Sequence, residues 1–249
     1  MDLSLIIPAF IAGIFTFLAP CTHIVKDDGT TVNILGFDKG KINAALWLYY
    51  NWVMFEVFWD AETKSWFDET SGNDPGKLGV SIVSVYWRNE KESRMHSFWE
   101  KDFDQMWKLF RDADRIIGFN TLGFDIPAMK PYAPADFASL PHFDILERIK
   151  LVNSGRGASL NAIARDTLGT EKIDSGANAV MYFKKGDPES LALLQKYCEA
   201  DVAITRDIYD FAIKNRFLKF TDKWNNARRV EVDFSYPKEA AAAKQSSLF

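Results

Sequence analysis

The chain has 249 residues, of which 47% are hydrophobic and 26% are charged, which is the profile of a folded globular protein rather than a disordered or collagen-like one. Its 30 lysines and arginines against 34 aspartates and glutamates give a net charge of −4, which argues against a protein that binds polyanions through a basic tail. An enzyme that cuts nucleic acid is not excluded, because metal-holding carboxylates lower the net charge while a binding surface stays basic. Cys21 and Cys198 are the two cysteines, too few and too far apart for a disulfide framework or a cysteine zinc site.

The chain begins with an apolar segment. Residues 3–20 carry no charge and come near the lower length limit for a membrane span. Because Pro20 stands where a secretory cleavage site needs a small residue, we expect no cleaved signal. We expect a cytoplasmic protein in which this segment permits membrane attachment without requiring it.

Part of this segment also carries a resemblance. The residues Pro8-Ala9-Phe10, Ala12-Gly13 and Phe15 to Cys21 resemble the first transmembrane helix of the cytochrome c biogenesis and thiol-disulfide transporter family. That resemblance implies a thiol chemistry in which Cys21 works with a cysteine on another transmembrane helix. No further helix of that kind follows in the sequence, so a membrane-anchored thiol protein is kept as an alternative only.

A short hairpin is predicted over residues 23–40, because Asp27-Asp28-Gly29 is a turn signal between two apolar runs. Met54 opens the first convincing strand. We therefore interpret residues 1–53 as an N-terminal extension, either a fusion or a misassigned start.

From Met54 onward the pattern is regular. Apolar runs predict strands over residues 55–59, 79–87 and 115–119, and a 3.6-residue apolar stripe predicts a helix over residues 102–113. Asp144, Ser159 and Asp187 are predicted to cap later helices. Strands first, then strands alternating with helices, predict an α/β domain with a mixed sheet flanked by helices over residues 54–225. Residues 226–249 are expected to form a flexible tail.

Three acidic segments stand out within this domain. Asp60 and Glu62 lie two apart at the end of the first strand, so they share one face. Two carboxylates there are costly unless a cation neutralises them, and Mg²⁺ and Mn²⁺ prefer oxygen ligands. Asp125 comes after a later strand, where a helix begins, and is by itself equally compatible with a helix cap. Tyr197 and Asp201 lie one turn apart on the last long helix, where a surface hydrogen bond is the alternative interpretation.

Taken together, the three segments resemble a known family. Asp-x-Glu, then Gly-Phe-Asn-x-x-x-Phe-Asp-x-Pro, then Tyr-Cys-x-x-Asp occur in the order typical of the DEDD (DnaQ-like) exonuclease superfamily. The chain resembles its tyrosine subclass, in the ribonuclease-H-like branch related to the proofreading domains of family B polymerases. The resemblance spans residues 55–218 and implies a ribonuclease-H-like fold and 3′-5′ exonuclease activity on single-stranded DNA or RNA.

The resemblance also implies roles for single residues. Asp60, Glu62 and Asp201 would hold one divalent ion, Mg²⁺ or Mn²⁺, while Asp60 and Asp125 would hold a second, about 4 Å away. Tyr197 would orient the attacking water, since a phenol with a pKa of about 10 is a poor base at neutral pH.

Several residues near the acids are candidates for contact with a substrate. Asn120 and Phe124, together with Trp66 and Phe67 in the loop after Glu62, are candidates for substrate contact, because aromatic faces stack on unpaired bases. Core packing is the competing role for Phe124. A nucleic-acid-binding module that keeps the fold without turnover is the alternative function.

The C-terminal residues carry a short motif. Gln245, Leu248 and Phe249 form Gln-x-x-Leu-Phe, which resembles the peptide by which bacterial replication and repair proteins bind the sliding clamp. A frayed end is the alternative interpretation of this segment.

Overall fold

The computed structural model describes residues 23–25, 31–33, 54–170 and 176–236. The chain divides into two compact units, residues 1–50 and 51–249. In the first unit, β1 (His23–Val25) pairs antiparallel with β2 (Thr31–Asn33), which confirms the predicted hairpin. The apolar segment at residues 3–20 and the clamp motif at Gln245, Leu248 and Phe249 lie outside the described residues and stay predictions. Among the described helices, none combines the length and the hydropathy that a bilayer crossing would need.

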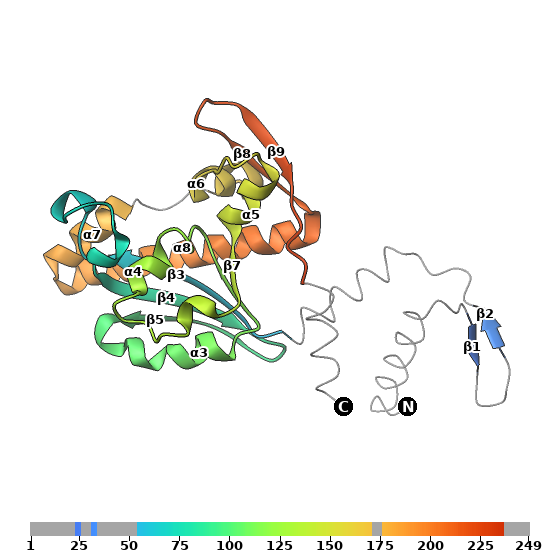
Figure 1. Ribbon diagram of the computed structural model, residues 1–249, viewed down its shortest axis with the longest axis horizontal. Helices are drawn as coiled ribbons and strands as arrows, with labels where there is room; N and C mark the ends of the chain where they lie inside the picture. Colours follow the sequence, from blue (N-terminus) through green and yellow to red (C-terminus); the bar gives the residue numbers. More distant parts are fainter. Residues whose placement is uncertain (1–22, 26–30, 34–53, 171–175, 237–249) are drawn as a thin grey trace. The chain divides into compact units, whose positions relative to one another are not determined.

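The second unit is built on a five-stranded mixed sheet in the order β5-β4-β3-β6-β7 (Figure 1). Its strands are β3 (Glu56–Thr63), β4 (Val80–Arg88), β5 (Ser93–Trp99), β6 (Arg115–Gly118) and β7 (His142–Asp144). The first three form an antiparallel meander, whereas β6 runs parallel to β3 and β7 runs parallel to β6. The predicted α/β fold with a mixed sheet is thereby confirmed.

Helices and helical turns connect and cover these strands. The α-helices are α3 (Trp107–Asp112), α4 (Asp125–Met129), α5 (Ile145–Val152), α6 (Leu160–Ile163), α7 (Gly176–Lys185) and α8 (Pro188–Asn215). Short 3₁₀ turns lie at Phe67–Glu69, Pro75–Lys77, Glu100–Gln105 and Phe137–Ser139, and the π-helix η5 (Ala164–Leu168) continues α6. A final hairpin consists of β8 (Phe217–Thr221) and β9 (Ala227–Glu231).

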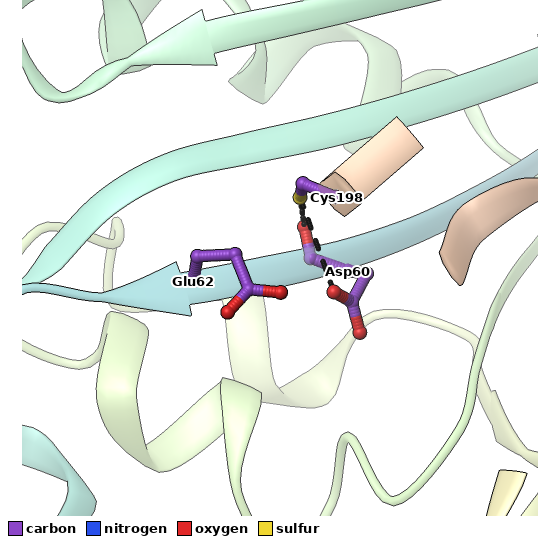
Figure 2. A group of neighbouring side chains, drawn as sticks. All are labelled: Asp60, Glu62 and Cys198. Atoms are coloured by element: carbon purple, nitrogen blue, oxygen red, sulfur yellow. Dashed lines mark hydrogen bonds between the residues drawn. The ribbon is translucent and has the colours of Figure 1, made fainter. Parts of the chain in front are cut away.

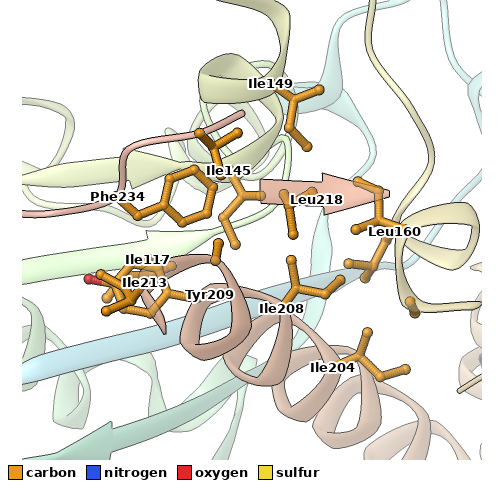
Figure 3. Packing of buried hydrophobic residues seen from close by; sticks show 14 of the residues in the cluster. Ile117, Ile145, Ile149, Leu160, Ile204, Ile208, Tyr209, Ile213, Leu218 and Phe234 are labelled. Atoms are coloured by element: carbon orange, nitrogen blue, oxygen red, sulfur yellow. The ribbon is translucent and has the colours of Figure 1, made fainter. Parts of the chain in front are cut away.

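The sheet separates two hydrophobic clusters, and the two-residue period of β3 decides which residues enter each. Val57, Trp59 and Ala61 pack on one face with residues of α3 and α4. Phe58 points to the other face, where residues of α5, α6, α8 and both strands of the last hairpin meet (Figure 3). Asp60 and Glu62 follow Phe58 in the same alternation, so the acids lie on the α8 face.

Helix α8 is the longest element on that face. As predicted, Asp187 caps it by accepting from the Ser190 amide at 3.0 Å, and Pro188 occupies its first position. No further proline or glycine interrupts its 28 residues, and it ends where Arg216 adopts a left-handed conformation with φ of 65°.

A buried polar network joins α8 to the start of β3. The Glu56 carboxylate, 1% exposed, accepts hydrogen bonds from Arg88 Nε at 2.7 Å and from the hydroxyls of Tyr209 and Tyr236 at 2.9 and 2.8 Å. Arg115 Nη1 donates to the Tyr209 hydroxyl at 2.8 Å, and its guanidinium lies 3.6 Å from the centre of the Tyr236 ring. Every buried polar group named here therefore has a partner, which is the condition for tolerating it in a core.

Several features of the domain differ from the sequence-based predictions. Strand β3 runs on to Thr63, so Asp60 and Glu62 lie within it and do not follow its end. Strands β5, β7 and β8 and helix α7 were not predicted. The flexible tail expected from residue 226 is wrong for its first part, because β9 pairs with β8 and Phe234 is fully buried.

Candidate active site

The first two acids meet a thiol from α8. One ligand atom each from Asp60, Glu62 and Cys198 lie within 4.8 Å of one another (Figure 2). Cys198 Sγ lies 3.5 Å from the backbone oxygen of Asp60 and 3.9 Å from its Oδ2. Burial, followed by the charges of Asp60 and Glu62, raises the pKa of the Cys198 thiol, so the sulfur is protonated and neutral. This agrees with the prediction that Cys198 is part of the core.

Asp125 reaches the same acids from the next parallel strand. Because β6 pairs with β3 only as far as Phe58 opposite Ile117, the amide of Ala61 has no strand partner on that side. Asp125 Oδ1 accepts from this amide at 3.1 Å. Since Ala61 stands between Asp60 and Glu62, this hydrogen bond places the second acidic segment directly beside the first.

The Asp125 side chain is a costly group to ionise. It is 4% exposed, and burial, followed by the charge of Asp60, raises the pKa of its carboxyl well above the usual value. A divalent cation would lower this cost, and the carboxylate oxygens of Asp60, Glu62 and Asp125 suit hard ions such as Mg²⁺ and Mn²⁺, whereas the protonated Cys198 thiol beside them does not. The residues present therefore fit the predicted metal ions.

The third acidic segment lies on α8 around Cys198, with Tyr197 just before it and Asp201 one turn after. Tyr197 is 5% exposed and Asp201 is 4% exposed. Burial, then the charges of Asp201, Glu62 and Asp60, raises the pKa of the Tyr197 phenol, which also has a side-chain hydrogen bond to Asp201. All three acids therefore act electrostatically on one phenol, and that phenol stays protonated at neutral pH.

A fourth aspartate fixes the loop that carries Asp125. The Asp144 carboxylate accepts from four backbone amides. Two belong to the loop after β6, Asn120 and Leu122, both at 2.9 Å, and two belong to the first turn of α5, Leu146 at 2.9 Å and Glu147 at 3.3 Å. The sequence predicted only the helix cap. The loop itself is tight: Asn120 has φ of 63°, and any side chain at Gly118 would collide with Thr121.

Comparison with known proteins assigns the family. A family model of the ribonuclease H superfamily matches residues 66–213, more than half of the chain. The chain belongs to the ribonuclease H superfamily. No curated protein matches the chain. Membership indicates a nuclease-type hydrolase with a nucleic acid substrate. The matched range includes Asp125, Tyr197 and Asp201 but not β3.

The four predicted substrate residues of this superfamily member lie in two neighbouring loops. The rings of Phe67 and Phe124 meet edge to face at 6.1 Å, Phe67 being 37% exposed. Phe124 is half-buried, so part of its ring packs as the competing interpretation expected. Lys184 Nζ of α7 lies 4.1 Å from the centre of the Trp66 ring and forms an ion pair with Glu69. Asn120 donates its amide to Asp144 and is half-buried.

Two participants were missed by the sequence-based predictions. Lys184, on a helix 115 residues after Glu69, gave no local signal of its position beside Trp66. The role of Asp144 in the loop after β6 was also missed, although the nearby glycine and asparagine of that loop indicated a tight turn.

Proposed function

We propose that this ribonuclease H superfamily member is a metal-dependent 3′-5′ exonuclease that acts on single-stranded nucleic acid ends. The observation that carries the proposal is the hydrogen bond from the Ala61 amide to Asp125, which joins two acidic segments 64 positions apart beside buried Tyr197 and Asp201. A ribonuclease H fold alone supports a nuclease-type function. The four acids Asp60, Glu62, Asp125 and Asp201, which we call the acid pocket, together with Tyr197 favour the tyrosine subclass of exonucleases.

In this proposal, each polar side chain of the pocket has one task. Asp60, Glu62, Asp125 and Asp201 would hold two divalent ions, Mg²⁺ or Mn²⁺, which when bound supply positive charge to the attacking and leaving oxygens of the phosphodiester. Tyr197, kept protonated by its surroundings, would orient the attacking water through its hydroxyl. Cys198 lies beside Asp60 and Glu62 as a neutral thiol and adds no charge to the acids.

Digestion of matched DNA and RNA oligomers, labelled at the 5′ end, tests the proposal. With Mg²⁺ or Mn²⁺ we expect successive shortening from the 3′ end, and with chelator we expect none. Asp60→Asn removes one carboxylate charge and should slow hydrolysis by more than about a hundredfold, since even outer-shell changes at metal sites cost roughly 10–100-fold. Asp136→Asn is the matched control, because Asp136 pairs with Arg111 on the exposed surface.

Two outcomes would contradict the proposal. Equal activity of Asp60→Asn and the parent protein would remove the acid pocket from the chemistry. Binding of the oligomers without any metal-dependent release of nucleotides would instead favour the alternative, a binding module of the same fold.

A further inference from the structure

The hairpin formed by β8 and β9 has one apolar and one polar face. Leu218, Phe220 and Val230 point into the core on the α8 side of the sheet. On the outer face, Lys219 stands opposite Arg229, and both cations lie over the Phe217 ring, at 5.7 and 4.0 Å from its centre. Like charges directly opposite each other destabilise a strand pair, so this arrangement carries a cost in the protein alone.

The tip of the hairpin presents an aromatic ring between cations. Trp224 is 58% exposed. Lys223 Nζ lies 4.5 Å from the centre of the Trp224 ring, and the Arg156 guanidinium, from the loop after α5, lies 5.6 Å from it. An exposed tryptophan flanked by two cations is the combination by which proteins stack on unpaired bases while meeting phosphates.

Three of these cations have no ion-pair partner among the described residues. Within the described ranges of the chain, Lys219, Lys223 and Arg156 form no ion pair, whereas Arg228 pairs with Asp222 and Arg229 pairs with Glu231. The Asp222 carboxylate accepts hydrogen bonds within the turn between β8 and β9. Hydrogen bonds led by the Asn226 amide lower the pKa of Asp222 to about 2, so it stays anionic and holds the tip in shape.

The hairpin and the acid pocket lie on the same face of the sheet. Phe58 of β3 packs in the same cluster as Leu218 and Val230, and Asp60 and Glu62 share the side of Phe58. Along α8, the 14 positions from Asp201 to the helix end at Asn215, just before β8 begins, correspond to about 20 Å at 1.5 Å per residue. A stacked strand rises about 3.4 Å per nucleotide, so roughly six nucleotides span the distance from Asp201 to the base of the hairpin.

We propose that the outer face and tip of the β8–β9 hairpin, with Arg156, form a second binding site for single-stranded nucleic acid, on the 5′ side of the end being hydrolysed. This inference rests on the proposed exonuclease function for its direction along the strand. Trp224 stacks on an unpaired base, and Lys219, Lys223 and Arg156 meet phosphates.

Binding of a labelled single-stranded 12-mer to the full chain, in chelator so that no hydrolysis occurs, tests the site directly. Trp224→Ala should weaken binding about 5- to 100-fold, the range seen for loss of base stacking, and Trp224→Phe should restore most of it. The double variant Lys219→Ala with Lys223→Ala should lower the slope of log affinity against log salt by about 1.4, since each phosphate contact on a single strand contributes about 0.7. Lys91→Ala with Lys108→Ala removes the same charge from exposed lysines elsewhere and should leave affinity and slope nearly unchanged.

Oligomer length separates failure of this site from failure of the proposed function. With Mg²⁺, the hairpin variants should raise the KM for the 12-mer and leave hydrolysis of a 4-mer, too short to reach the hairpin, at the parent rate. Loss of metal-dependent hydrolysis with both oligomers in the parent protein would refute the exonuclease, while the binding measurement still tests the hairpin. Unchanged affinity of Trp224→Ala and of the double lysine variant for the 12-mer, or tighter binding of a duplex than of the single strand, would overturn the site.

Discussion

At the scale of single residues, burying acids close together lowers the stability of the fold, and the same arrangement is what would let them hold cations. The pKa of Asp125 is raised first by burial and then by the charge of Asp60. A carboxyl with a higher pKa in the folded than in the unfolded protein stabilises the fold below its unfolded pKa, near 3.8, and loses that contribution as pH rises through the folded value. Wherever Asp125 is ionised without metal, its buried charge therefore destabilises the fold.

Asp125→Asn should relieve this burden, because an amide oxygen can still accept from Ala61 while the charge is gone. In chelator at pH 8, we expect the Tm to rise by a few degrees, given about 2–4 °C per kcal/mol for a domain of this size. The gain should shrink as pH falls, and Mg²⁺ should raise the Tm of the parent more than that of the variant. Calorimetry from pH 4 to pH 8 measures both effects, and a variant less stable than the parent at pH 8 in chelator would contradict them.

At the scale of elements, the pocket is positioned by loops that follow parallel strands. Asp144 ties the loop after β6 to the first turn of α5, so one side chain aligns two segments more than 20 positions apart. The carboxylate is 3% exposed, and the four part-buried amides that it accepts from would otherwise lack this acceptor.

Asp144→Ala should therefore cost more than an ordinary cap. We expect a loss of about 3 kcal/mol of unfolding free energy, against about 1 kcal/mol for a typical cap, together with a fall in the proposed exonuclease activity as Asp125 shifts. Ser159→Ala is the matched control, since Ser159 caps α6 through one amide at 3.2 Å and does not contact the loop after β6. Urea denaturation and the oligomer assay follow the two effects. Equal losses in both variants would show that Asp144 is only a cap.

The sequence predicted those parts of the fold that have local causes. Apolar runs and caps gave β4, β6, α5 and α8, because propensity and capping act over a few residues. Strand β5 is an edge strand with four polar or charged side chains among its seven positions, counting His96, and its place is set by pairing with β4. The order of the acidic segments was readable from the sequence, whereas the contact between Asp125 and Ala61 depends on how β6 ends beside β3.

At the scale of the whole domain, residues after β9 close the core. Phe234 is fully buried against Phe143 and Tyr209, its backbone oxygen accepts from Arg115 at 2.6 Å, and the Tyr236 hydroxyl donates to Glu56. This closure was missed because the short segment has no periodic pattern, and its burial depends on contacts with residues more than 100 positions earlier.

Phe234→Ala should destabilise the entire domain. Truncation of a buried phenylalanine typically costs about 3–5 kcal/mol, which at this size lowers the Tm by roughly 10 °C. Trp224→Ala, an aromatic truncation at the exposed tip of the neighbouring hairpin, is the control and should leave the Tm nearly unchanged. Thermal unfolding followed by circular dichroism compares them. A similar small shift for both would mean that the segment after β9 does not belong to the cooperative core.

Helix α8 touches strand β3 through polar groups at two separate points. In its first half the Cys198 thiol meets the backbone of Asp60, and near its end the Tyr209 hydroxyl meets Glu56. These points are about 16 Å apart along the helix and about 13 Å apart along the strand, in opposite directions. With a single contact, α8 could rotate about it or shift along β3. With two contacts, it cannot do either without breaking one of them. The alignment of Asp201 with the strand acids thus depends partly on the distant contact, where Tyr209, Tyr236 and Arg88 bind the Glu56 carboxylate, which lies outside the proposed metal site.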